Sequence, residues 1–253
     1  MRIVTTAFFT FSLLYITPSA LAAECAAKSA AHTVPLLELY TSEGCSSCPP
    51  ADKWLSSLNV KLTDVTPLAF HVDYWDYIGW KDAFSKAEYS TRQRKMAAFN
   101  FAGFVYTPQF VLNGKDFKGW DNTRLNKSIA KAHSLPARAQ LTLSTSTAAN
   151  GYLTLNASAT ATDDVKNADV FVAIYENKLV SQVNAGENNG RQLKHDYVVR
   201  EFFGAYQMNN RNQLNKQFYL NKLWKSRDAG AVMFVQDTSN GEILQSLALK
   251  FCS

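Results

Sequence analysis

The chain has 253 residues, of which 47% are hydrophobic, and its 26 basic and 21 acidic residues leave a formal net charge of +5. The basic residues are spread along the chain without a long run, so the charge does not favour a nucleic-acid-binding protein. The length allows one large domain or two smaller ones. The sequence has no phosphate-binding glycine loop, nucleophile elbow or multi-histidine motif, and we expect no cofactor.

Residues 1–23 have the features of a secretory signal peptide. Arg2 supplies one positive charge, residues 7–16 are largely apolar, and residues 19–23 are small residues of the kind that a signal peptidase accepts. A membrane anchor would need about 20 apolar residues, and here polar residues and a proline interrupt the run. We therefore expect an exported protein, periplasmic or secreted, without a stable membrane span.

A strand, two cysteines and a helix follow one another early in the mature chain. Residues 34–40 predict a buried strand, and residues 50–58 have a short helical pattern. Cys45 and Cys48 lie between them, and cysteines at this spacing can close and reopen a disulfide. The amide groups and dipole at a helix start stabilise a thiolate. The order of these elements therefore predicts redox chemistry at the two cysteines.

The alternation of strand and helix continues as far as residue 133. The next elements are a strand, a helix, a hairpin and a helix, expected at residues 67–72, 82–99, 109–120 and 121–133. Asp82 is the expected N-cap of the first of these helices, and Asn113-Gly114 is a typical hairpin turn. Because basic side chains are usually exposed, Arg92, Arg94 and Lys95 are interpreted as a solvated helix face.

Thr107 and Pro108 stand immediately before the hairpin. A thiol–disulfide enzyme needs a proline loop that faces its cysteines and offers backbone hydrogen bonds to an extended substrate. The joint order of strand, Cys-x-x-Cys, helix, strand, helix, Thr-Pro, hairpin and helix resembles the thioredoxin fold. We therefore expect an α/β thioredoxin-like domain over residues 34–135, with Thr107 and Pro108 in its catalytic site.

Residues 138–253 have the pattern of short strands separated by turns. The expected strands are residues 140–145, 152–159, 170–176, 179–183, 195–203, 215–220, 231–237 and 243–251. Alternation with a period of two is clear in residues 152–157, and Asn150-Gly151 and Asn240-Gly241 are turn signals. This spacing predicts an all-β, sandwich-like domain over residues 138–253.

Two groups of polar residues are candidates for supporting roles. His71 and Asp73 lie two residues apart and share one face of the strand end, so Asp73 is our candidate for proton transfer to the thiol pair. The structural alternative, in which Asp73 caps a turn and His71 is a satisfied core residue, remains open. His195 and Arg200 are assigned a structural role, either supporting residues 186–190 or contacting the first domain.

The four cysteines of an exported chain can pair in three ways. If Cys45 pairs with Cys48, then Cys25 and Cys252 remain, near the two ends of the mature chain. These two form a structural disulfide if the ends lie close together.

Three stretches of the sequence together resemble one known family. They are Glu-Leu-Tyr-Thr-Ser-Glu-Gly-Cys-Ser-Ser-Cys-Pro-Pro-Ala-Asp at residues 38–52, His-Val-Asp-Tyr-Trp-Asp at residues 71–76, and the segment from Gly186-Glu187-Asn188-Asn189-Gly190-Arg191 to Arg200. The family is the bacterial secreted family called domain of unknown function 1223. The resemblance spans nearly the whole mature chain and implies a thioredoxin-like domain followed by a β-rich one.

The function expected from this pattern is that of an exported thiol–disulfide oxidoreductase. Cys45 would be the thiolate that attacks a disulfide and Cys48 would resolve the mixed disulfide. The partners would be protein thiols or disulfides and a further redox partner that the sequence does not identify. Two alternatives remain open. One is a non-catalytic envelope binding module in which the Cys45–Cys48 disulfide is structural. The other is a protein that handles Cu(I) or zinc through Cys45, Cys48 and His71.

Overall fold

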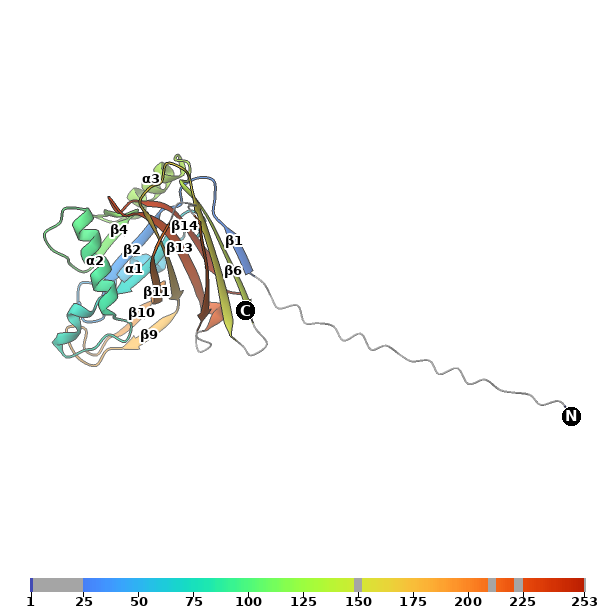
Figure 1. Ribbon diagram of the computed structural model, residues 1–253. Helices are drawn as coiled ribbons and strands as arrows, with labels where there is room; N and C mark the ends of the chain where they lie inside the picture. Colours follow the sequence, from blue (N-terminus) through green and yellow to red (C-terminus); the bar gives the residue numbers. More distant parts are fainter. Residues whose placement is uncertain (2–24, 148–151, 209–212, 221–224, 253) are drawn as a thin grey trace.

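The computed structural model describes residue 1 and residues 25–147, 152–208, 213–220 and 225–252. The predicted signal peptide, apart from its first residue, lies outside these ranges. Of the described residues, 43% are in strands and 20% in helices, so strands dominate the fold (Figure 1). No helix in the described ranges is long and apolar enough to cross a bilayer.

The helices and strands alternate in the first half of the chain and give way to strands in the second. The helices are α1 (Pro49–Ser57), α2 (Ala87–Phe99) and α3 (Asn122–His133), with the short 3₁₀ helices η1 (Asp73–Ile78) and η2 (Ser226–Asp228). The strands are β1 (Cys25–Lys28), β2 (Leu36–Thr41), β3 (Thr66–His71), β4 (Gln109–Leu112), β5 (Lys115–Asp116), β6 (Ala139–Thr147), β7 (Leu153–Ala161), β8 (Ala168–Glu176), β9 (Leu179–Gln182), β10 (Gln192–His195), β11 (Val198–Gln207), β12 (Gln213–Leu220), β13 (Ala229–Asp237) and β14 (Ile243–Lys250).

These strands form one large sheet and two smaller ones. The large sheet has eight strands in the order β14-β13-β8-β11-β3-β2-β4-β5. A four-stranded sheet has the order β1-β6-β7-β12, and β9 pairs with β10. In the large sheet β3 is parallel to both β2 and β11, whereas β2 and β4 are antiparallel.

The predicted fold class, an α/β thioredoxin-like domain followed by an all-β domain, is wrong. Strands β2 to β5 do not form a sheet of their own, because β3 pairs with β11 from the second half of the chain. Val198 stands opposite Ala69, and the Ala69 N–H donates to the Tyr197 carbonyl at 2.8 Å. An unpaired strand edge exposes backbone donors and acceptors, and β11 pairs with the edge of β3 at this position. The result is a mostly β fold with one sheet shared by both halves.

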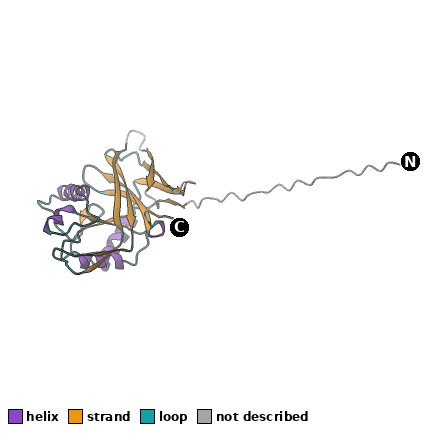
Figure 2. Cartoon of the chain, turned by 90° about the horizontal axis from the view of Figure 1, so that it is seen from below, coloured by secondary structure: helices purple, strands orange, loops and turns teal. Residues whose placement is uncertain are grey.

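Both faces of the large sheet are covered (Figures 1 and 2). Helix α2 lies on one face, where Tyr89 and Met96 pack against β2, β3, β8 and β13. On the opposite face, α1 and α3 cover the β2–β4 end, and the four-stranded sheet covers β8, β13 and β14. Side chains alternate between the faces, so that Phe171 of β8 packs on the α2 side and its neighbour Val170 on the other.

Two elements begin at places that the sequence pattern did not indicate. Helix α2 begins at Ala87 with Lys86 as its N-cap, and Asp82 instead accepts hydrogen bonds in the interior. The strand expected at residues 195–203 is divided, because β10 ends at His195 and β11 begins at Val198. His195 therefore lies at the end of β10, just before the turn that leads into β11 of the large sheet.

Arg92 on α2 is buried, which contradicts its assignment to a solvated helix face. Its guanidinium donates to both carboxylate oxygens of Glu38 on β2, at 2.6 and 3.0 Å. It also lies 4.8 to 5.3 Å from the ring centroids of three phenylalanines from the second half of the chain, Phe171, Phe202 and Phe234. Arg94 and Lys95 are exposed. Arg92 therefore links the helix to both halves of the large sheet.

Replacing Arg92 by methionine should lower the free energy of unfolding by about 3–5 kcal/mol, because Glu38 would remain buried as an uncompensated charge. Adding Glu38→Gln should recover most of this loss. Urea unfolding followed by circular dichroism measures both effects. The control Arg94→Met, on the exposed side of the same helix, should change the value by less than about 0.5 kcal/mol. Equal losses for the Arg92 and Arg94 variants would contradict this account.

Cys25 on β1 and Cys252 after β14 are joined by a disulfide, with their Cα atoms 5.8 Å apart. The bond spans 227 positions of sequence and so restricts the unfolded chain strongly.

The double variant Cys25→Ser/Cys252→Ser should lose about 2–5 kcal/mol of unfolding free energy in the same assay. Lys28→Ala, an exposed change on β1, is the control. A double variant as stable as the control would show that the bond does not stabilise the fold.

Candidate functional site

Cys45 and Cys48, the two cysteines of the Cys-x-x-Cys motif, lie in the turn between β2 and α1. The two residues form a disulfide with their Cα atoms 5.4 Å apart. Cys48 is the N-cap of α1, and Pro49 and Pro50 occupy the first two helical positions, where a missing N–H leaves no hydrogen bond unmade. Ser47 Oγ lies 3.3 Å from Cys45 Sγ. A hydroxyl donor and a helix start therefore lie next to these sulfur atoms.

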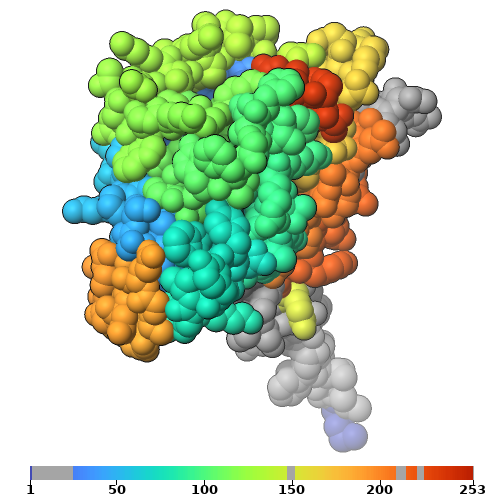
Figure 3. Space-filling model, turned by 90° about the vertical axis from the view of Figure 1, so that its left-hand side faces the viewer, coloured from blue at the N-terminus to red at the C-terminus, as the bar shows by residue number. Residues whose placement is uncertain are grey.

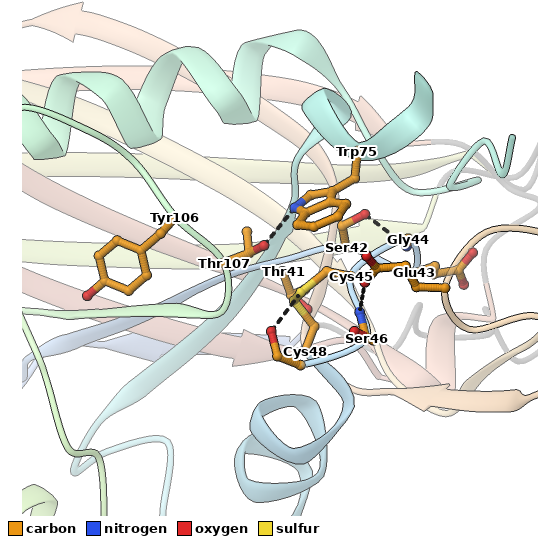
Figure 4. Close-up of a disulfide and its surroundings, with 12 residues drawn as sticks. Thr41, Ser42, Glu43, Gly44, Cys45, Ser46, Cys48, Trp75, Tyr106 and Thr107 are labelled. Atoms are coloured by element: carbon orange, nitrogen blue, oxygen red, sulfur yellow. Dashed lines mark hydrogen bonds between the residues drawn. A yellow bond between two sulfur atoms is a disulfide. The ribbon is translucent and has the colours of Figure 1, made fainter. Parts of the chain in front are cut away.

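Both cysteines are buried, with exposed fractions of 1% for Cys45 and 0% for Cys48. Trp75 of η1 lies beside the disulfide (Figure 4), and a Cβ atom placed on Gly44 would be only 3.1 Å from the Trp75 Cβ. Residues 186–190, called the capping loop below, contact the same turn from the second half of the chain. A partner's sulfur can reach the disulfide only after one of these neighbours moves.

The Thr107–Pro108 loop lies on the Trp75 side of the disulfide (Figure 4). Thr107 Oγ1 accepts a hydrogen bond of 2.8 Å from Trp75 Nε1. The peptide bond between Thr107 and Pro108 is cis. The indole of Trp75 thus connects the proline loop to the cysteine turn.

The capping loop is hydrogen-bonded to the cysteine turn through a buried asparagine. Asn188 Nδ2 donates to the carbonyl oxygens of Glu43 and Cys45, at 2.8 and 3.0 Å. At the surface, Glu187 accepts a hydrogen bond of 2.9 Å from the backbone N–H of Ser46. The space-filling view shows the segment around β9 and β10 against the start of α1 and the η1 region (Figure 3). The two halves of the chain therefore build this surface together.

Five titratable side chains are buried near the cysteine turn. They are Glu43, Asp52, His71, Asp82 and His195, which come from the turn, α1, the end of β3, the segment before α2 and the end of β10. Asp52, His71 and His195 each offer a nitrogen or carboxylate oxygen, and these atoms lie within 4.8 Å of one another. Such a concentration of buried ionisable groups is typical of functional sites.

His71 and Asp82 form the tightest contact of this cluster. His71 Nδ1 lies 2.6 Å from Asp82 Oδ2, and the Asp82 carboxylate also accepts the backbone N–H groups of Glu43 and Phe84, each at 2.9 Å. Burial alone would raise the pKa of Asp82, but His71 and these N–H groups lower it overall. The other nitrogen of His71, Nε2, is buried and has no hydrogen-bond partner among the described residues.

His195 lies between two carboxylates. Its Nε2 is 3.3 Å from Glu43 Oε1, and its Nδ1 is 3.6 Å from Asp52 Oδ1. Its ring meets that of His71 edge to face, with the centroids 4.9 Å apart. Burial lowers the pKa of His195, but Asp52 and Glu43 raise it by more, to about 10. His195 is therefore protonated, an imidazolium, at neutral pH.

The two carboxylates that face His195 are each anchored at their second oxygen. Asp52 Oδ2 accepts a hydrogen bond of 2.9 Å from Thr41 Oγ1, and Glu43 Oε2 accepts one of 2.8 Å from Trp80 Nε1. Glu43 Oε1 has no hydrogen-bond partner in the described part of the chain. The anchored oxygens fix both side chains and leave their other oxygens pointing toward His195.

The structure separates Asp73 and His71, which the sequence analysis had placed together. Asp73 begins η1, and its carboxylate accepts a hydrogen bond from Ser90 Oγ on α2. His71 instead joins the cluster with His195, to which no spacing in the sequence relates it. Glu43 and Asp52 were also missed, although both flank the cysteines in the sequence. Their nearness to Cys45 and Cys48 was the signal that could have found them.

Replacing Asn188 by alanine should loosen the capping loop, because two buried carbonyl oxygens lose their donor. We expect a loss of about 1–3 kcal/mol in unfolding free energy and faster reduction of the Cys45–Cys48 disulfide by dithiothreitol. Alkylation of quenched samples followed by mass spectrometry measures the reduction rate. Asn189→Ala, at the exposed neighbouring position, should behave as the wild type. An unchanged rate in the Asn188 variant would show that the capping loop does not limit access.

Two solved structures have a similar fold. A protein of Agrobacterium tumefaciens from a structural genomics programme is 24% identical and has a TM-score of 0.64, with 87% of this chain and 96% of that chain covered. HBP35 of Porphyromonas gingivalis is 16% identical and has a TM-score of 0.65, with 88% of this chain and 76% of that chain covered. At these identities the likeness concerns the fold alone. No curated protein is significantly similar in sequence.

A family profile covers most of the chain, including the cysteine turn, the capping loop and all five residues of the buried cluster. It is described as "Protein of unknown function (DUF1223)" and matches residues 36–236. The chain therefore belongs to the DUF1223 family.

Proposed function

We propose that the protein is a thiol–disulfide oxidoreductase that acts on protein thiols or disulfides through Cys45 and Cys48. The observation that carries this proposal is the position of their disulfide at the start of α1, beside Trp75, which is hydrogen-bonded to Thr107 of the proline loop. A helix start stabilises the thiolate that exchange requires. Ser47 Oγ, at 3.3 Å from Cys45 Sγ, is placed to donate a hydrogen bond to that thiolate.

The exchange reaction transfers two electrons between the cysteine pair and its partner. A thiolate of the partner attacks Cys45 Sγ, the Cys45–Cys48 bond breaks, and Cys48 leaves as a thiolate. The partner's second thiolate then attacks its own sulfur in the mixed disulfide and releases Cys45. The partner is oxidised to a disulfide, the cysteine pair is reduced to a dithiol, and two protons pass from the partner to the pair. The reverse sequence reduces a partner disulfide.

The buried state of the pair requires an opening step before this exchange. We assign that step to Trp75, whose hydrogen bond to Thr107 a binding partner would replace, and to the capping loop. The rim around the disulfide is then the surface that a protein partner contacts. Small thiols, which cannot compete for these contacts, should react slowly with the oxidised protein.

The cellular setting that we propose follows from the leader sequence. Residues 1–23 would direct export to the periplasm or the exterior, where disulfides persist. The electron donor or acceptor that resets the pair would be a second exported redox protein.

The burial of the disulfide favours one alternative, a non-catalytic binding module in which Cys45–Cys48 is structural. An exposed fraction of 1% at Cys45 is what a structural disulfide would have. Metal handling through the cysteines has less support, because it needs two thiolates and the disulfide offers none.

A Cys48→Ser variant tests exchange directly, because Cys45 can then form a mixed disulfide but nothing resolves it. Incubated with an extract of exported proteins, it should accumulate higher-mass species on non-reducing gels that collapse on reduction. Mass spectrometry should locate the link at Cys45. Adding Trp75→Ala should raise the yield, whereas Tyr77→Ala, at an exposed position on η1, should not.

The double variant Cys45→Ser/Cys48→Ser is the control and should trap nothing. If Cys48→Ser with and without Trp75→Ala also traps nothing, and the double variant only loses stability, the disulfide is structural and exchange is ruled out.

A further inference from the structure

We propose that Asp52, His71 and His195 form a zinc site beside the disulfide, with ligands from α1, β3 and β10 and none from the cysteines. The three side chains are buried, and their donor atoms lie within 4.8 Å of one another. This site is separate from the proposed exchange chemistry, because its ligands are the same in the oxidised and reduced protein.

His71 has the environment of a metal-binding histidine. Its Nδ1 is held by Asp82 at 2.6 Å, and Asp82 is itself fixed by backbone N–H groups. Its Nε2 is buried without a partner among the described residues. Histidines that bind metals usually donate their second ring N–H to a carboxylate, which fixes the tautomer and the ring orientation. Here the carboxylate is in place on Nδ1, and Nε2 is the nitrogen left for a metal.

His195 repeats this arrangement. Its Nε2 lies 3.3 Å from Glu43 Oε1, which gives it a carboxylate behind the ring, and its Nδ1 lies 3.6 Å from Asp52 Oδ1. Both ring nitrogens lack a hydrogen bond within the described chain. Because Nε2 faces the Glu43 carboxylate, Nδ1, which lies nearer to Asp52, is the nitrogen available to a metal. The two histidines thus present one nitrogen each next to Asp52.

The spacing of the donor atoms is close to that of a zinc site. Bonds of about 2.0 Å in a tetrahedral site separate neighbouring ligand atoms by about 3.3 Å. The separation of 3.6 Å between His195 Nδ1 and Asp52 Oδ1 nearly meets this value. The widest separation, within 4.8 Å, would have to shorten by up to about 1.5 Å on binding.

The excess of negative charge in the cluster also favours the binding of a cation. Glu43, Asp52 and Asp82 bring three carboxylates into a buried region that contains two histidines. Buried charges are stable only when they are paired or bind metals. A proton on His195 offsets one of these charges, whereas Zn²⁺ offsets two and uses the free nitrogen of His71 as well.

The donor set and an entry path both suit zinc. Two imidazoles and one carboxylate are typical zinc ligands, whereas Ca²⁺ and Mg²⁺ prefer oxygen ligands throughout. A pocket of about 370 Å³ between α1 and β10 is lined by both Asp52 and His195. This pocket opens from the surface beside two of the three ligand residues.

Isothermal titration of the oxidised full-length protein with ZnCl₂ tests the site. We expect one Zn²⁺ per chain with a Kd of about 1 µM or tighter. Asp82→Asn should weaken binding by about 10–100-fold, as changes behind a ligand do, and His71→Gln and His195→Gln should weaken it further. The matched control is His32→Gln/His133→Gln, which removes a pair of neighbouring histidines elsewhere in the fold and should leave zinc binding unchanged.

Co²⁺ provides an independent readout of the ligands. The oxidised protein with Co²⁺ should have the visible bands of a four-coordinate nitrogen and oxygen site, without a thiolate charge-transfer band. If the histidine variants fail to fold, Asp52→Asn replaces them, because it keeps the shape of the side chain. Zn²⁺ should then raise the melting temperature of the wild type but not that of Asp52→Asn.

Three results would overturn the proposal. The first is that the oxidised wild type does not bind zinc. The second is that the His71 and His195 variants still bind zinc whereas the His32/His133 control does not, and the third is that zinc binds only after the protein has been reduced. The first would leave His195 as an imidazolium paired with two carboxylates. None of them bears on trapping by Cys48→Ser, so the two proposals fail separately.

Discussion

The short parallel contact between β3 and β11 is the constraint on which the rest of the structure depends. Its backbone hydrogen bond runs from Ala69 to Tyr197, and only one pair of residues stands in register. Through it the strands of the first half continue into those of the second. His71 lies two residues after Ala69, and His195 lies two residues before Tyr197. The contact that joins the sheet therefore also joins the two histidines.

The protein buries charge in two places, with different consequences. Between α2 and the sheet, Arg92 and Glu38 neutralise each other with two short hydrogen bonds among aromatic rings. Near the cysteine turn, three carboxylates face two histidines, and several polar atoms have no partner in the described chain. Removing one member of a satisfied pair leaves an uncompensated buried charge, so the pair constrains the elements that carry it. A cluster whose buried polar atoms lack hydrogen-bond partners can bind a proton or a metal ion.

The cysteine turn is closed from two sides by parts of the chain far apart in sequence. Trp75 connects it to the Thr107–Pro108 loop, and Asn188 holds the capping loop on it. This closure separates two properties that the Cys-x-x-Cys pattern alone does not distinguish, the ability to form a disulfide and the access of a partner to it. Catalysis, on the proposal made above, depends on how readily Trp75 and the capping loop open.

Local sequence patterns predicted the elements well. The strand expected at residues 34–40 corresponds to β2, the helix at 121–133 to α3, and the disulfide-forming cysteines lie where the motif placed them at the start of α1. Hydrophobic period, turn residues and helix caps act within a few residues, so the order of amino acids alone specifies them. The shared sheet, the burial of Arg92 and the meeting of His71 with His195 follow from contacts between segments far apart in the sequence, 54 residues in the case of Arg92 and Glu38. Such contacts exist only once the chain has folded, because backbone pairing and burial between distant segments leave no local pattern in the sequence.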